Sequence, residues 1–290
     1  MTAGGHIPAA APDAMRPTAA PDKAGTPGAP GARQGRGMRL GRVGRPLDVA
    51  AAALALLQCA GLAGLLPPTI PSPAAILRAL QQDYPLLAGH TAATLEAAAV
   101  GFAAALAVGL VLMAIVAFVP PLESLVYNAA LILHTLPLLV LAPILVIWFG
   151  LGMEARIIIS ALAAYYAILM GALHGLRASP RSAGELMRLL SASRMQVFRK
   201  VTLPYALPAL FAGVKIGATG AVLGAVIAEW TGAERGLGVM MAYSLFSFQV
   251  PRVWLTMFTM MVVAVAVYAL VQAAERRLLR WARPAGGEPA

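Results

Sequence analysis

Residues 93–118 read ATLEAAAVGFAAALAVGLVLMAIVAF, and this stretch decides the class of the protein. It contains a single charged residue, Glu96, close to its beginning. A helix needs about 20 predominantly apolar residues to cross roughly 30 Å of hydrocarbon. The stretch meets this length, so the sequence predicts a transmembrane helix here.

Five further apolar segments accompany this one along the chain. The six together cover residues 48–66, 93–118, 125–149, 156–176, 207–229 and 253–274. They are continuous apolar runs without the alternation typical of barrel strands, and only helices or closed barrels can span lipid. We therefore expect an all-α integral membrane protein with six transmembrane helices, in one membrane domain over residues 47–278.

The composition agrees with this class. Hydrophobic residues make up 60% of the 290 residues, charged residues only 12%, and the mean hydropathy is +0.77. Soluble domains carry about 25% charged residues. One cysteine, Cys59, excludes a disulfide within the chain, and the four histidines lack metal-ligand spacing, so we expect no metal site.

The two ends of the chain read as cytoplasmic tails. Residues 1–46 are rich in Ala, Gly, Pro and Arg and cannot bury enough apolar surface to order themselves, which predicts disorder. Met15 and Met38 are alternative start positions to Met1. Residues 279–290 form the second tail.

The distribution of Lys and Arg predicts the orientation. Most of them lie in the N-terminal tail, in the connection between the fourth and fifth segments, and after the sixth segment, whereas the opposite connections hold Arg78, Arg156, Arg235 and Arg252. Basic loops stay inside. We expect a multi-pass protein of the bacterial inner membrane with both termini in the cytoplasm. Because the basic residues alternate with apolar segments, they indicate topology and not nucleic-acid binding.

The connection over residues 177–206 is longer than a helix hairpin needs. Its apolar residues recur at spacings typical of short amphipathic helices, and Pro204 ends the pattern. Such a helix can lie on lipid or dock in a groove of a partner. A basic surface helix that serves only topology is the alternative.

This connection resembles the cytoplasmic loop of ABC importer permeases, written EAA, three residues, G, nine residues, I-x-L-P. Glu185 falls on the Glu, Val201 on the Ile, and Leu203-Pro204 on the Leu-Pro. In that family the loop forms a coupling helix that docks on a cytosolic ATPase. The resemblance implies an ATPase-coupling role for Glu185, Arg188, Ser191, Val201, Leu203 and Pro204.

The sequence departs from the family motif at three positions. Leu186 and Met187 replace the two alanines, and Ser191 replaces the glycine. The missing glycine leaves open how the backbone turns at Ser191.

Two more stretches resemble the nitrate, sulfonate, taurine and thiamine-precursor subgroup of these permeases. They are residues 134–150, HTLPLLVLAPILVIWFG, and residues 228–238, AEWTGAERGLG. Glu96 and the pair Glu229-Trp230 favour permeases for pyrimidine precursors of thiamine. Sulfonate, taurine or nitrate remain alternative substrates.

Four glycines are predicted to serve helix packing. Gly213, Gly217, Gly220 and Gly224 share one face of the fifth segment, and small residues let membrane helices approach closely. This prediction includes a contact between two copies of the chain. Room for a substrate path is the less favoured alternative. Val222 is expected to face lipid.

Ionisable residues inside spans are costly and mark functional sites. His134 with Thr135 and Glu229 are candidates for the substrate path, whereas Lys215 is expected to extend its ammonium group towards the cytoplasmic boundary. Pro137 and Pro143 are expected to kink the third segment rather than to line a cavity.

The resemblance implies a transport system of several subunits. The chain contains no GxxxxGK[ST] nucleotide motif and no GxSxG or HExxH motif, so no cofactor is expected in it and it is not expected to be an enzyme. An ATPase dimer would use the ATP, an extracytoplasmic solute-binding protein would deliver the substrate, and a second copy of the chain would complete the path. A secondary transporter is the alternative of another class.

Overall fold

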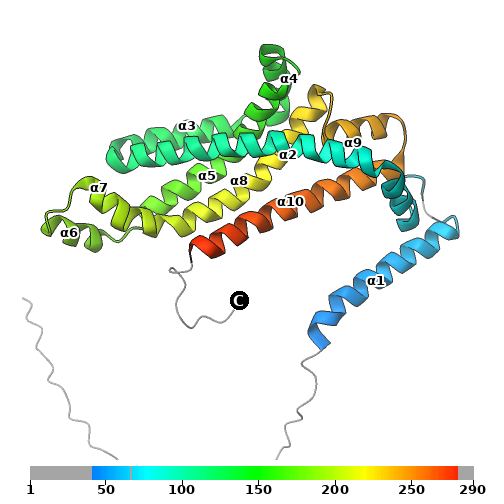
Figure 1. The fold of residues 1–290 in the computed structure, drawn as a ribbon, viewed down its shortest axis with the longest axis horizontal. Helices are drawn as coiled ribbons and strands as arrows, with labels where there is room; N and C mark the ends of the chain where they lie inside the picture. The colour runs from blue at the N-terminus through cyan, green and yellow to red at the C-terminus, as the bar shows by residue number, and fades with distance from the viewer. Residues whose placement is uncertain (1–40, 66, 280–290) are drawn as a thin grey trace, which may run out of the picture. The chain divides into compact units, whose positions relative to one another are not determined.

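The computed structural model describes residues 41–65 and 67–279. Within these ranges the regular structure is entirely helical (Figure 1). The α-helices are α1 (Gly41–Leu62), α2 (Pro73–Phe118), α3 (Glu123–Thr135), α4 (Leu138–Phe149), α5 (Met153–Arg177), α6 (Arg181–Leu189), α7 (Arg194–Val197), α8 (Leu203–Gly232), α9 (Leu237–Phe246) and α10 (Val250–Leu278). A short 3-10 helix, η1 (Pro120–Leu122), and a π-helical turn, η2 (Phe198–Thr202), complete the chain order.

The predicted all-α membrane fold is confirmed. Four helical stretches are long and apolar enough to cross a membrane: α2, α5, α10 and the continuous stretch Arg194–Gly232 that includes α8. The α3–α4 pair makes a fifth if counted as one bent span, and α1 contributes a shorter apolar helix over Ala51–Leu62. The predicted tails, residues 1–46 and 279–290, lie mostly outside the described residues.

Helix α2 is much longer than the predicted segment 93–118. Ser72 caps its start by accepting a hydrogen bond from the Ala75 N–H, and Pro73 occupies the first turn, where no N–H is needed. At 1.5 Å per residue the path of its 46 residues is about 69 Å long, with Pro85 inside the helix and a bend near its beginning (Figure 1). Since hydrocarbon is only about 30 Å thick, part of α2 must lie outside it.

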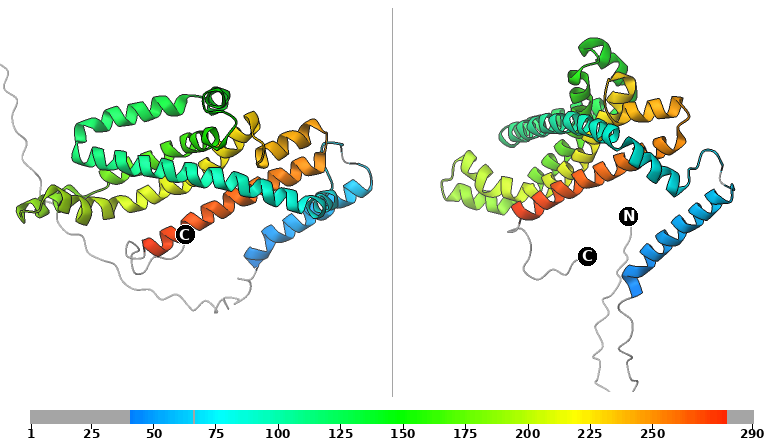
Figure 2. Two further views of the ribbon diagram at one scale, coloured as in Figure 1. Left: turned by 45° about the horizontal axis from the view of Figure 1, so that its top comes forward. Right: turned by 45° about the vertical axis from the view of Figure 1, so that its right-hand side comes forward.

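The third predicted segment is not one straight helix. α3 and α4 meet at an angle of 90° (Figures 1 and 2). Pro137 lacks an N–H and forces Leu136 into an extended conformation, which ends α3. The expectation of a simple kink at Pro137 was therefore wrong, whereas Pro143 lies inside α4.

The core forms where α5 packs along α8, with α2 beside them. All four predicted glycines of α8 lie against α5 of the same chain. A Cβ atom on Gly220 would lie 2.8 Å from the Ala163 carbonyl oxygen, and one on Gly224 would lie 2.7 Å from the Ala163 Cβ. The glycine face is therefore occupied within the chain, and it is not a free surface for a second copy.

Val222 was wrongly expected to face lipid. Its side chain is only 3% exposed and belongs to the main core. The neighbouring Leu223 is exposed instead, because one residue corresponds to a 100° turn on a helix.

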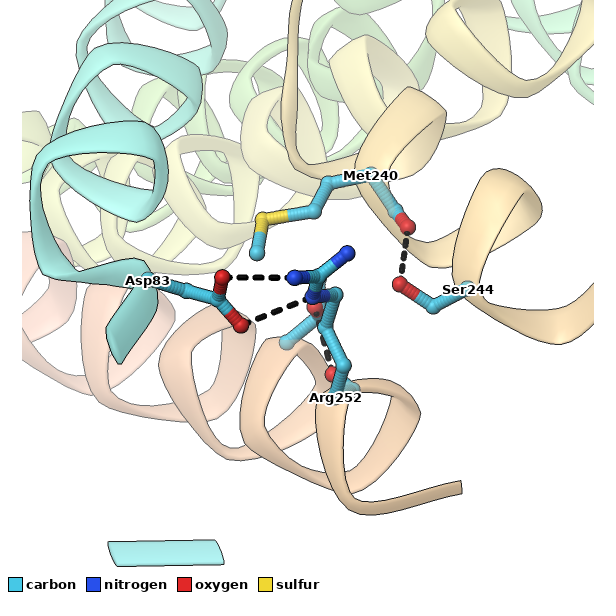
Figure 3. A network of polar contacts seen from close by, with 5 residues as sticks. Asp83, Met240, Ser244 and Arg252 are labelled. Carbon is cyan, nitrogen blue, oxygen red and sulfur yellow. Dashed lines mark hydrogen bonds and ion pairs between the residues drawn. The ribbon is translucent and has the colours of Figure 1, made fainter. Parts of the chain in front are cut away.

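Two ion pairs join α10 to other helices. Lys215 on α8 binds Glu275 with an Nζ–Oε2 distance of 2.7 Å. Asp83 on α2 binds Arg252 through both carboxylate oxygens, at 2.7 Å from Nε and 2.6 Å from Nη2 (Figure 3). A bidentate pair of this kind fixes orientation as well as distance. Lys215 is thus paired with an acid inside the helix bundle.

Candidate functional site

A cavity of about 380 Å³ lies at the break between α3 and α4. Its walls come from this break and from the facing sides of α5 and α8, and include His134, Thr135, Pro137, Leu162, Gly220 and Gly224. The two glycines lie where α8 contacts α5 and contribute only backbone atoms to the wall. Cavities of this size, mostly apolar with a few polar groups, are typical of small-molecule sites.

His134 and Thr135 supply the polar side chains of this cavity. The His134 ring stacks on Tyr166 of α5, with a centroid distance of 4.0 Å and an interplanar angle of 2°. Thr135 donates a hydrogen bond to the Ile132 carbonyl at 2.7 Å. The structure thus brings together two of the three predicted substrate-path residues.

Tyr165 holds α3 in place beside the cavity. Its hydroxyl donates to the Ala130 carbonyl at 2.7 Å. Because Tyr165 and Tyr166 are neighbours on α5, one residue fixes the backbone of α3 and the other supports the ring of His134. The position of His134 is therefore determined by two contacts with α5.

Glu229, the third predicted path residue, does not line this cavity. It is 1% exposed and accepts hydrogen bonds from the Gly238 N–H at 2.9 Å and from the Thr94 hydroxyl at 3.0 Å. Gly238 lies in the first turn of α9, whose first N–H groups have no partner inside the helix. Glu229 therefore caps α9.

Two residues of α2 complete this cap. The Leu237 N–H donates to the Thr94 hydroxyl oxygen at 2.8 Å, and the Gly236 N–H donates to His90 Nδ1 at 2.9 Å. Gly236 has a φ of 144°, and a Cβ there would collide with the Glu229 carboxylate. Sequence reasoning missed His90 and Thr94, because nothing in their local sequence indicates a partner more than 140 residues away.

Removing the Glu229 carboxylate should loosen α9. In a Glu229→Ala variant the Gly238 N–H and the Thr94 hydroxyl lose a buried acceptor, which costs about 1–3 kcal/mol. Amide hydrogen exchange at residues 236–240 should become faster. Glu229→Gln, which keeps an acceptor oxygen, should retain most of the protection.

Glu96→Ala is the matched control for this measurement, since Glu96 is an exposed acid two residues from Thr94. Equal exchange rates in Glu229→Ala and Glu96→Ala would show that the carboxylate does not hold α9.

The predicted coupling residues separate into two groups. Glu185 and Arg188 lie exposed on α6, near the exposed side chains of Leu186, Leu189 and Leu190. Val201 is buried, and Leu203 packs against the main core, while Pro204 lies in the first turn of α8. The first group can contact a partner, and the second anchors the loop to the bundle.

Ser191 makes the turn for which the motif has glycine. Its φ is +56°, its N–H donates to the Arg188 carbonyl at 2.9 Å, and the Ala192 N–H donates to the Met187 carbonyl at 3.0 Å. These two bonds are the Schellman ending of a helix. Ser193 and Gln196 then form a capping box that begins α7. The serine therefore adopts the left-handed backbone that glycine adopts more easily.

A second cavity, of about 330 Å³, lies beside the Asp83–Arg252 pair. Its lining includes His90, Tyr243, Ser244 and Arg252, from α2, α9 and α10. Figure 3 shows two of these residues, Ser244 and Arg252. Both Asp83 and Arg252 are engaged with each other, which leaves no free charge of this pair for a ligand.

Known proteins resemble this chain over most of its length. Residues 105–280 match the family described as binding-protein-dependent transport system inner membrane component. The formylaminopyrimidine transport permease ThiX of Halalkalibacterium halodurans is 29% identical over 74% of this chain and 86% of its own. The riboflavin transport system permease RibX of Chloroflexus aurantiacus is 32% identical over 73% of this chain and 80% of its own.

A solved structure has a similar fold. The methionine ABC transporter MetNI, in an inward-facing conformation, superposes with a TM-score of 0.52 at 25% identity. The match covers 69% of this chain and 96% of the matched chain.

Proposed function

The chain belongs to the family of binding-protein-dependent transport system inner membrane components, and from this premise we propose that it carries a pyrimidine precursor of thiamine across the membrane. As a member of that family it is a multi-pass permease subunit of an ABC importer in the inner membrane, and it is not itself an enzyme. We propose in addition the solute, the partner subunits and the orientation of the chain in the membrane.

The observation that carries the choice of solute is the cavity at the α3–α4 break. Tyr166 covers one face of the His134 ring, so the remaining face and the ring edge are what the cavity can offer to a solute. Aromatic rings attract one another in offset or edge-to-face arrangements. A planar nitrogen heterocycle fits such a wall, and the names of two relatives refer to heterocycles of this kind.

Anionic solutes fit this cavity less well. Its lining contains no Lys or Arg, and a charge taken out of water needs a compensating partner. Sulfonates and taurine carry a negatively charged sulfonate group, and nitrate is itself an anion. In this cavity such a charge could contact only the polar side chains of His134 and Thr135. These substrates are therefore the second choice.

The exposed surface of α6 supports the proposed ATPase partner. The exposed apolar side chains of α6, together with Glu185 and Arg188, form a surface suited to the groove of a cytosolic ATPase dimer. We propose that α6 and both termini lie in the cytoplasm, which the basic residues in these parts of the sequence support. An external binding protein would deliver the solute, a second copy would complete the path, and ATP would be hydrolysed only by the partner subunit.

Uptake into proteoliposomes that contain the cognate ATPase and binding protein tests the solute. Labelled formylaminopyrimidine should be taken up, and an aliphatic sulfonate should not. A His134→Leu variant removes an aromatic contact worth about 0.5–1.5 kcal/mol, which corresponds to a roughly 2- to 10-fold weaker half-saturation.

His174→Leu serves as the control, because His174 is an exposed histidine of α5 that does not line the cavity. Preferential uptake of the sulfonate, or identical uptake by the His134 and His174 variants, would contradict the proposed solute site.

A further inference from the structure

A separate cavity of about 290 Å³ lies where the end of α2 meets the loop between α5 and α8. Its lining includes Arg188 of α6, Arg194 of α7, and the apolar side chains of Phe118, Pro120 and Phe198. No residue of the cavity at the α3–α4 break takes part in it. It is therefore a second candidate site, distinct from the path of the solute.

The two arginines of this cavity lack a counter-charge. Among the described residues neither Arg188 nor Arg194 forms an ion pair. Glu123, the acid that follows η1 in the chain, already binds Arg177 with an Oε1–Nε distance of 2.6 Å. Glu185, one turn before Arg188, is exposed and makes no ion pair with it. An uncompensated pair of guanidinium groups attracts a phosphate or a carboxylate.

The apolar part of the cavity narrows the class of ligand. The rings of Phe118 and Phe198 meet with a centroid distance of 5.5 Å. Phe118 is the last residue of α2, so the cavity lies where a membrane span ends. A site with basic groups on one side and apolar groups on the other, at the cytoplasmic end of spans, is typical of lipid headgroup binding.

We propose that this cavity binds the phosphate headgroup of an anionic phospholipid. The volume suits a headgroup, while the acyl chains would remain in the bilayer beside α2. The bound lipid would contact both the end of α2 and the predicted coupling loop through Arg188. The composition of the inner leaflet would then influence the loop that is proposed to receive the ATPase.

Lipid binding by the purified full-length chain tests this proposal without any transport measurement. Native mass spectrometry should detect bound phosphatidylglycerol in preference to phosphatidylcholine. Each arginine near an anionic surface contributes about a fivefold change in affinity. The double variant Arg188→Gln, Arg194→Gln should therefore bind phosphatidylglycerol roughly 25-fold more weakly.

The matched control is Arg199→Gln, Lys200→Gln, which removes two exposed positive charges outside the cavity. Circular dichroism should show the same helix content for both double variants. Equal loss of phosphatidylglycerol in the two would overturn the proposal in favour of general surface attraction. Binding of soluble glycerol phosphate as strong as that of the lipid would also overturn it.

A protein ligand is the remaining outcome against the proposal. The double variant at Arg188 and Arg194 could bind phosphatidylglycerol as well as the wild type does. If it also lost ATPase binding to the same extent in phosphatidylcholine and in phosphatidylglycerol, the two arginines would bind the ATPase and not a lipid. Because these assays measure binding alone, an error in the proposed solute would leave their result unchanged.

Discussion

A Gly213→Leu variant is expected to lose much of its stability. A Cβ at Gly213 would collide with the Ala167 carbonyl oxygen and lie 3.0 Å from the Gly171 Cα. Overpacking a close-packed core costs about 1–3 kcal/mol, and occasionally more. Because the obstructing atoms belong to the backbone of α5 and cannot rotate away, we expect about 3 kcal/mol or more. The thermal midpoint in detergent should fall by roughly 10 °C.

Ala212→Leu is the matched control for this prediction. Ala212 precedes Gly213 on the same helix but is exposed, so a larger side chain there can point away from the core. The midpoint should stay close to the wild-type value. If both variants melted at the same temperature, the close contact between α5 and α8 would not limit stability.

A Glu185→Lys variant is expected to separate ATP hydrolysis from transport. Glu185 is exposed on α6 and forms no ion pair among the described residues, so its carboxylate is available to a partner. Truncating one member of a buried charged pair at an interface costs about 2–5 kcal/mol. This corresponds to an ATPase affinity that is lower by roughly 30-fold to several thousand-fold.

Co-purification of the ATPase and substrate-stimulated hydrolysis in liposomes measure this effect. Ser182→Lys adds the same positive charge to α6 without removing the acid, and should have a much smaller effect. Glu185→Gln should be intermediate. Normal ATPase association and coupled uptake in Glu185→Lys would show that Glu185 has no role in coupling. Uptake by the wild type without any ATPase would instead support the secondary-transporter hypothesis.

The sequence predicted the class of fold because hydropathy records the cost of exposing polar groups to lipid. A window of about 20 residues finds spans and little else. It missed α9, which is apolar but only 10 residues long, and it missed the first half of α2, where Gln81, Gln82 and Asp83 lower the hydropathy of a helical segment. Helices that do not match the thickness of the bilayer need tertiary contacts to be recognised.

Local sequence effects predicted only part of the candidate site, because its other contacts join distant helices. His134 and Thr135 precede a proline, and the local effect of Pro137 on its neighbours explains the cavity at the break. Glu229 was singled out as an ionisable residue within a span and as a candidate for the substrate path, but it lies outside the cavity and its partners are on α2 and α9. Residue type indicates that a buried acid needs partners, and only the packing of distant helices determines which ones.

Helix α8 has a mechanical consequence, because its two ends are attached to different parts of the transporter. Its first residues continue the connection over residues 177–206 through the π-helical turn, and its other end carries Glu229, which holds α9. Its 30 residues extend about 45 Å, and the glycines between these ends press it against α5. Because α5 lies against α8 from Ala206 to Gly224, the two helices form one packed unit. A displacement of the loop that precedes α8 would then move Glu229 and α9 together with this unit, with no relay of side chains needed in between.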